Sequence, residues 1–177
     1  MQRHNHCGRY PTQLPLGDGV RTLIVGGYAN GETGTPTPSI EIFDFLNNTV
    51  TTLSRVPELV SLGGLILNPI VIQLPWTDDI LPAGSFPLLL FGGNAGQVMF
   101  ASPDNQVNAL RDLPPWPTPG FVSALSAAGG HTLLTLEPEN GYAAELAMFG
   151  GTTLSGGEAT PLHRATMPRR LPGSCAP

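Results

Sequence analysis

The sequence has little charge and no run of basic residues. Only 12% of its 177 residues are charged, with 13 Asp or Glu against eight Lys or Arg and a net charge of −5. A protein that follows a phosphate backbone or an anionic membrane surface needs clustered Lys and Arg. We therefore expect neither nucleic acid nor an anionic membrane as a partner.

Long apolar stretches and a cysteine framework are also missing. Residues 62–74 form an apolar stretch that Asn, Pro and Gln interrupt, whereas a membrane-spanning helix needs about 18 apolar residues. Residues 1–7 lack the apolar core of a secretory signal. The two cysteines, Cys7 and Cys175, could pair if the termini meet, but two free thiols are the preferred interpretation. We expect a chain without a membrane span or a signal peptide.

What the sequence does contain is a repeat. An apolar run followed by two glycines occurs at residues 23–27, 89–93 and 146–151. The first glycines of these pairs are 92 − 26 = 66 and 150 − 92 = 58 residues apart, which is close to the length of a kelch-type propeller blade. Each repeat is therefore predicted to be one small antiparallel sheet.

A second set of matches supports the repeat. Five residues of the first repeat recur in the second at a constant offset of 57, namely Phe43, Asn48, Val50, Leu53 and Pro57 against Phe100, Asn105, Val107, Leu110 and Pro114. The difference between offsets of 66 and 57 falls in residues 28–39, which are rich in Gly, Thr and Pro. We predict a longer loop there, because repeat proteins tolerate insertions in their connections.

The predicted fold is all-β, with about two and a half blades of an incomplete kelch-type β-propeller. The 22 glycines and 19 prolines separate short apolar segments, and no segment has a convincing helical pattern. Gly17-Asp18-Gly19 predicts a tight hairpin. Strands are expected at 12–16, 22–25, 39–43 and 50–53, then at 65–74, 86–91, 97–100 and 107–110, and finally at 121–125, 131–136 and 143–149.

The double glycines themselves receive a structural interpretation. Glycine lets neighbouring backbones approach and the chain turn at the end of an interior strand. The Gly-Lys-Ser/Thr of a phosphate-binding loop follows none of them. Nucleotide binding is therefore not expected.

The repeat pattern ends after residue 151. We predict a flexible tail at 1–8, a partial propeller domain at 9–151 and a disordered or aberrant tail at 152–177. Propellers close a ring of at least about four blades, so we expect this chain to be a fragment. A frameshift or intron read-through could produce such a tail.

The order of the motifs is more specific than the repeat. Arg9-Tyr10-Pro11-Thr12, Leu-x-x-Gly-Asp-Gly and the first double glycine occur in sequence, and the segments 105–114 and 134–145 follow downstream. This order, across roughly residues 8–151, resembles that of glyoxal oxidases, copper radical oxidases related to galactose oxidase. The resemblance implies an extracellular, monomeric enzyme that oxidises a small aldehyde to a carboxylic acid and reduces O2 to hydrogen peroxide.

By this resemblance Tyr10 is the catalytic residue and the only copper ligand that can be assigned. The family couples this tyrosine through a thioether to a cysteine and adds two histidines and an axial tyrosine around the copper. Cys7 is not that cysteine, because a spacing of three in a strand places Cys7 and Tyr10 on opposite faces. The sequence has no adjacent Tyr-His pair, and Arg9 replaces the family's tryptophan. We expect these residues alone to bind no copper and to release no peroxide, so whether the chain is an enzyme stays open.

The remaining candidates receive structural interpretations. The cluster of His4, His6 and Cys7 is interpreted as a solvated tail, and Asn47 begins a glycosylation sequon, Asn47-Asn48-Thr49, for which a simple turn is preferred. Surface, tail or packing roles are expected for His131, His163, Trp76 and Trp116. The alternative function is a non-catalytic kelch-like module that binds a protein or a glycan. A hydrolase is disfavoured, because Gly-x-Ser-x-Gly is absent.

Overall fold

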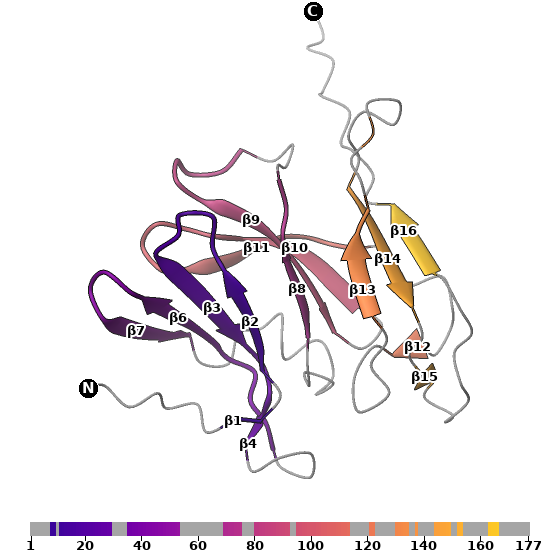
Figure 1. Ribbon diagram of the computed structural model, residues 1–177, viewed down its shortest axis with the longest axis horizontal. Helices are drawn as coiled ribbons and strands as arrows, with labels where there is room; N and C mark the ends of the chain where they lie inside the picture. Colours follow the sequence, from indigo (N-terminus) through magenta and orange to yellow (C-terminus); the bar gives the residue numbers. More distant parts are fainter. Residues whose placement is uncertain are drawn as a thin grey trace, which may run out of the picture.

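The computed structural model of the protein describes residues 8–9, 11–29, 35–53, 69–75, 80–92, 95–113, 121–122, 130–134, 137, 144–149, 152–153 and 163–166. Within these residues every regular element is a β-strand and every strand pairing is antiparallel (Figure 1). The predicted all-β class is confirmed for this part of the chain.

The first four-stranded sheet, here called the N-terminal sheet, has the strand order β2-β3-β6-β7. Its strands are β2 (Thr12–Pro15), β3 (Arg21–Val25), β6 (Ile40–Asp44) and β7 (Thr49–Leu53). The predicted hairpin between β2 and β3 is present, and Gly19 takes the expected positive φ of 70°. All four strands predicted for the first repeat therefore form, and they form one sheet.

The second four-stranded sheet, the central sheet, repeats this arrangement. Its strands follow one another in chain order: β8 (Ile70–Gln73), β9 (Phe86–Gly92), β10 (Ala95–Ala101) and β11 (Val107–Asp112). The predictions for the second repeat are thus confirmed, except that residues 65–68 of the first predicted strand lie outside the described residues. The first two repeats are both antiparallel meanders of four strands.

The C-terminal sheet has three strands, with β14 (Glu145–Phe149) between β13 (Gly130–Leu133) and β16 (His163–Thr166). The sequence pattern did not predict β16, which lies in the segment expected to be a tail. In that segment the structure also places β15 (Thr152–Thr153), which pairs with β12 (Phe121–Val122).

The insertion in the first repeat contains structure of its own. β4 (Tyr28–Ala29) and β5 (Thr35–Pro36) form a short hairpin, and β1 (Gly8–Arg9) pairs with the other edge of β4. The prediction that 28–39 is only a loop was therefore wrong. The extra residues allow this segment to fold back and pair with the start of the chain.

The structure supports the repeat alignment at two kinds of position. Gly26 follows and Gly92 ends the second strand of its four-stranded sheet; Gly26 and Gly27 have positive φ, 67° and 100°, whereas Gly92 belongs to β9 and does not. Asn48 and Asn105 are the two non-glycine residues with positive φ in the described part of the chain. They occupy the same place in the β6–β7 and β10–β11 hairpins, as the offset of 57 predicts.

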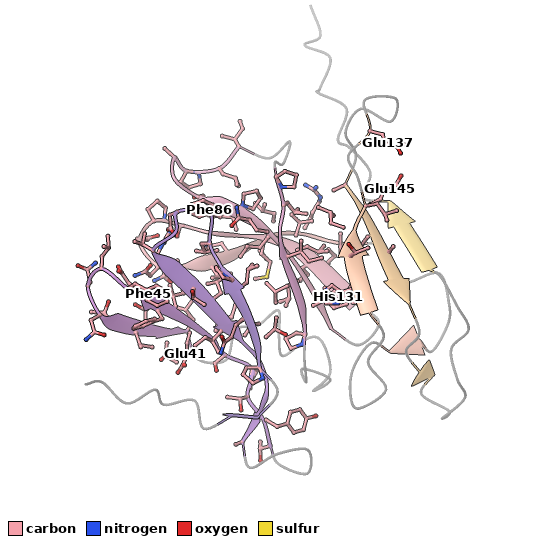
Figure 2. All side chains as sticks on the ribbon, in the orientation of Figure 1. Glu41, Phe45, Phe86, His131, Glu137 and Glu145 are labelled. Atoms are coloured by element: carbon pink, nitrogen blue, oxygen red, sulfur yellow. The ribbon has the colours of Figure 1, made fainter. Side chains whose placement is uncertain are left out.

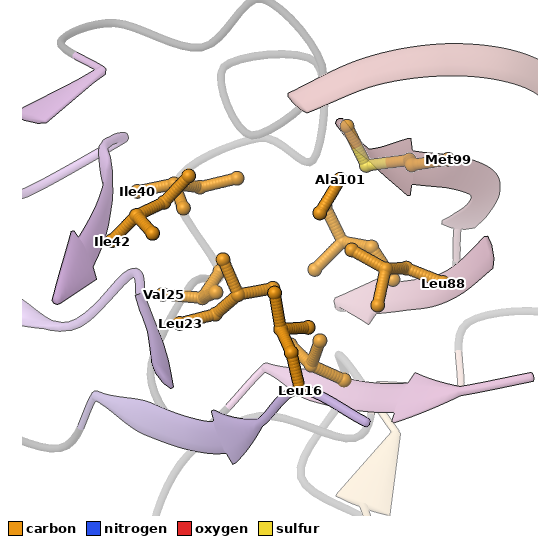
Figure 3. Close-up of a cluster of buried hydrophobic side chains, with 10 residues drawn as sticks. Leu16, Leu23, Val25, Ile40, Ile42, Leu88, Met99 and Ala101 are labelled. Atoms are coloured by element: carbon orange, nitrogen blue, oxygen red, sulfur yellow. The ribbon is translucent and has the colours of Figure 1, made fainter. Parts of the chain in front are cut away.

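The three sheets follow one another in chain order and pack through their faces (Figure 1). One apolar cluster lies between the N-terminal and central sheets, and Figure 3 shows its side chains pointing toward one another from both. Its buried members are Leu16, Leu23, Val25, Ile40, Ile42, Val71, Leu88, Leu90, Met99 and Ala101. A second cluster joins the opposite face of the central sheet to Leu146 of the C-terminal sheet.

Strand β9 explains how one sheet supplies both clusters. Leu88 and Leu90 belong to the first cluster, whereas Leu89 and Phe91 belong to the second. Successive side chains of a strand point to opposite faces, so a continuous apolar run buries both faces of the sheet. Burial of each such side chain stabilises the folded state by about 1.5–3 kcal/mol. Because β9 supplies buried side chains to both clusters, it is the centre of the core.

Candidate functional site

Tyr10, the predicted catalytic residue, lies outside the described residues, but the strands on either side of it are described. β1 ends one residue before it and pairs with β4, with Arg9 opposite Tyr28. β2 begins two residues after it and pairs with β3, with Thr12 opposite Val25. The described strands before and after Tyr10 thus belong to two different sheets, β1 to the sheet of β4 and β5 and β2 to the N-terminal sheet.

The N-terminal and central sheets meet near this end. The hydroxyl of Thr12 donates a hydrogen bond of 2.5 Å to the carbonyl of Pro69, the residue before β8. β2 and β8 also make the closest approach between strands of the two sheets. The first strand of one sheet thus lies beside the first strand of the next, and Tyr28 packs against the cluster between the two sheets.

A buried arginine forms the most extensive polar link between these two sheets. Arg21, at the start of β3, is 8% exposed, and its Nε donates to the carboxylate of Asp18 at 2.6 Å. Its Nη1 donates to the carbonyl of Ser102 at 2.7 Å and to Oδ1 of Asn105 at 3.2 Å. The guanidinium also lies 5.7 Å from the centroid of the Phe86 ring, within the range of a cation–π contact. One side chain therefore anchors the β10–β11 turn to the neighbouring sheet.

The partner carboxylate adapts to this contact. Desolvation raises the pKa of Asp18, but hydrogen bonds from the Arg21 side chain and from the backbone amides of Val20 and Arg21 lower it more, so the net pKa lies below the usual value. Asp18 therefore stays ionised and both orders the β2–β3 turn and holds Arg21. This role is structural, since the network links two sheets.

Two buried carboxylates were missed by the sequence analysis as individual sites. Glu41 of β6 is fully buried and accepts a hydrogen bond of 3.4 Å from the hydroxyl of Thr52. Glu145, at the start of β14, is 8% exposed, and Figure 2 labels it near the same end of the C-terminal sheet as the exposed Glu137. One feature of the sequence hinted that Glu41 is buried, because it stands between Ile40 and Ile42 in an apolar strand. Alternation alone would have placed it on an exposed face.

The structure brings two predicted histidine candidates into one row of the C-terminal sheet. His131 of β13 pairs with Met148 of β14, and Met148 pairs on its other side with His163 of β16. His131 is exposed, as predicted, and desolvation lowers its pKa. The sequence could not show this row, because it depends on the unexpected strand β16.

The other predicted candidates fall on residues that the structure does not describe. They are His4, His6, Cys7, Trp76, Trp116 and Cys175. Among the described residues no three His, Cys, Asp or Glu side chains are grouped so that they could hold a metal ion. In the same part of the chain no helix is long and apolar enough to cross a membrane.

Comparison with known proteins identifies no family for this sequence. No protein-family model matches the sequence, and no curated protein matches it significantly.

Proposed function

We propose that this chain supplies consecutive blades of a kelch-type β-propeller belonging to a copper radical oxidase of the glyoxal oxidase type. The observation that carries the proposal is the repetition of one architecture. Residues 12–53 and 70–112 form two four-stranded antiparallel meanders, with a double glycine at the end of the second strand of each. Propeller blades are antiparallel sheets of four strands.

The way the sheets pack supports the same proposal. The N-terminal and central sheets come closest at their first strands, β2 and β8, and the central sheet buries side chains on both faces. In a propeller the first strands of neighbouring blades lie close together because they line a common axis. Each blade is buried on both faces because it lies between two others. The order of motifs around Tyr10 then favours the glyoxal oxidase type among kelch-type propellers.

In this proposal Tyr10 is the residue of the chain that contributes to the chemistry. In the complete oxidase its phenolate would hold copper, and the copper with the oxidised tyrosine supplies the two-electron chemistry that converts an aldehyde and O2 to an acid and peroxide. The strands on either side of Tyr10 are each paired, β1 with β4 and β2 with β3, which supports this role.

The residues of this chain do not by themselves make a complete ligand set. The three tyrosines of the sequence, Tyr10, Tyr28 and Tyr142, precede Pro11, Ala29 and Ala143, so no adjacent Tyr-His pair is present. We therefore propose that these 177 residues alone do not oxidise aldehydes. Purified chain incubated with copper and methylglyoxal is expected to release no peroxide.

A chimera tests the assignment directly. Residues 9–151 of this chain would replace the corresponding segment of a glyoxal oxidase, which then supplies the remaining ligands. The proposal predicts copper-dependent peroxide release that is lost in Tyr10→Phe and retained in the matched control Tyr28→Phe. A folded chimera whose copper spectrum and peroxide release do not depend on Tyr10 would contradict the proposal and favour the binding-module alternative.

A further inference from the structure

The glycosylation sequon Asn47-Asn48-Thr49 lies at the tip of the β6–β7 hairpin. It is the single Asn-x-Ser/Thr sequence in the 177 residues. β6 ends at Asp44, which pairs with Thr49 at the start of β7, so Asn47 and Asn48 lie in the turn. Residues 45–49 are all exposed. N-glycans occur on surface turns of this kind, where the acceptor amide projects into solvent.

The turn is held in one conformation by its own residues. The carboxylate of Asp44 accepts hydrogen bonds from the backbone amides of Leu46 at 2.9 Å and Asn47 at 3.0 Å, and from Nδ2 of Asn47 at 2.7 Å. Asn48 follows with a φ of 50°, which completes the reversal of the chain. The acceptor amide is therefore presented at the end of an ordered hairpin and not within a sheet.

Two exposed apolar residues precede the acceptor asparagine in the same turn. Phe45, two residues before Asn47, is 58% exposed, and Leu46 is 78% exposed. The Phe45 ring packs edge-on against Phe43, with centroids 4.6 Å apart and planes at 70°, which fixes its position. An exposed aromatic ring offers a flat apolar face. The apolar face of a sugar attached at Asn47 would find this ring beside it.

We propose that Asn47 is an acceptor for an N-linked glycan whose first sugar covers Phe45. The donor is an N-acetylglucosamine-containing oligosaccharide linked to a lipid diphosphate. Nδ2 of Asn47 forms a bond to C1 of the first sugar while the bond from C1 to the diphosphate oxygen breaks. Nδ2 loses one proton to a base of the transferase, and the lipid diphosphate leaves without a change of oxidation state. The glycosylated amide keeps one hydrogen, with which it can still donate to Asp44.

The equivalent hairpin of the central sheet shows why the site is specific to the first repeat. Asn105 has the positive φ of Asn48, but Val107 stands where a sequon starting at Asn105 needs a hydroxyl. Oδ1 of Asn105 also accepts a hydrogen bond from Arg21, and its side chain is half-buried. The second hairpin thus lacks the hydroxyl, and its asparagine is less exposed than Asn47.

Expression of the full chain behind a cleavable secretion leader in eukaryotic cells tests this proposal. A C-terminal tag carries an Asn-Gly-Thr sequon as a control for passage through the glycosylation compartment, so the test does not depend on the protein's own route. Mass spectrometry before and after treatment with a peptide N-glycosidase is expected to show one glycan on the tag and one on Asn47. The second should be lost in Asn47→Gln and Thr49→Ala and retained in Thr49→Ser.

Two further variants test the structural basis. Phe45→Ala is expected to lower the occupied fraction of Asn47, because the sugar loses the ring that it covers. Val107→Thr completes a sequon at Asn105, and we expect that sequon to stay unmodified because Arg21 holds the side chain. A glycosylated tag with an unmodified Asn47 would overturn the proposal. Equal modification of Asn105 in Val107→Thr would overturn the argument from exposure.

Discussion

The first and second repeats, residues 12–53 and 70–112, share one strand order but differ in their tertiary partners. The N-terminal sheet contributes buried side chains to one apolar cluster, whereas the central sheet contributes to two. The β10–β11 turn is anchored by Arg21 of the neighbouring sheet, whereas the β6–β7 turn is capped by its own Asp44 and exposes Phe45 and Leu46. The same local signals thus produce one turn that joins two sheets and another that is exposed to solvent.

The largest expected effect comes from removing side chains on the two faces of β9. Leu89→Ala and Leu90→Ala should each lower the free energy of unfolding by about 2–5 kcal/mol, because each leaves a cavity in a different cluster. Leu46→Ala, at an exposed leucine, is the matched control and should change it little. Urea unfolding measures all three. A small effect of Leu89→Ala would show that the second face of the central sheet is not a packed interface.

Breaking the anchor of the second turn should have the next largest effect. Arg21→Met keeps much of the apolar stem but removes the guanidinium donor from Asp18, the Ser102 carbonyl and Asn105, so that Asp18 and Ser102 keep only their backbone donors. We expect a loss of about 1.5–3 kcal/mol. Arg21→Lys should recover only part of it, because lysine keeps the charge but not the planar set of donors. Full recovery by lysine in urea unfolding would argue against the directed hydrogen bonds.

The two asparagines with positive φ offer a matched comparison. Asn48→Ala should cost about 1–2 kcal/mol of backbone strain, and Asn48→Gly should cost almost nothing. Asn105→Gly relieves the same strain but also loses the bond to Arg21, so it should still cost about 0.5–1.5 kcal/mol. Thermal and urea unfolding of these three variants would measure the difference. An equal change in the free energy of unfolding for Asn48→Gly and Asn105→Gly would contradict the predicted difference between the two turns.

The smallest effect concerns pH. The folded state lowers the pKa of Asp18 and Asp44 from the ordinary 3.8. A carboxyl group with a depressed folded pKa stabilises the protein above its unfolded pKa, and this stabilisation is lost as pH falls through the folded value. Stability should therefore drop below about pH 4. Asp18→Asn should reduce this dependence more than Asp44→Asn, because Asp18 is paired with a buried arginine. The free energy of unfolding would be measured from about pH 2 to 7. The same pH dependence for both variants and the parent protein would contradict this prediction.

Local patterns in the sequence predicted the strands of both four-stranded sheets and the two hairpins of the N-terminal sheet. These patterns are local and involve only a few residues each: alternating and continuous apolar runs, Gly17-Asp18-Gly19 and the recurrent asparagines. They agree with the structure. The missed features depend on distant partners. Arg21 reaches a turn some 80 residues away, β16 pairs with the edge of β14 that β13 does not occupy, and the burial of Glu41 depends on what packs over its strand. The sequence-predicted site, Tyr10, falls outside the described residues, whereas its flanking strands could be placed.

Native-state hydrogen exchange of the Leu90→Ala variant tests the central claim, that the two repeats form one packed unit through the faces of their sheets. Leu90 belongs to β9 but packs in the cluster that the N-terminal sheet shares. The account predicts that the variant lowers the opening free energy of amides in β3 and β9 by the same amount, as expected of one cooperative unit. Faster exchange confined to the central sheet, with β3 unchanged, would contradict it.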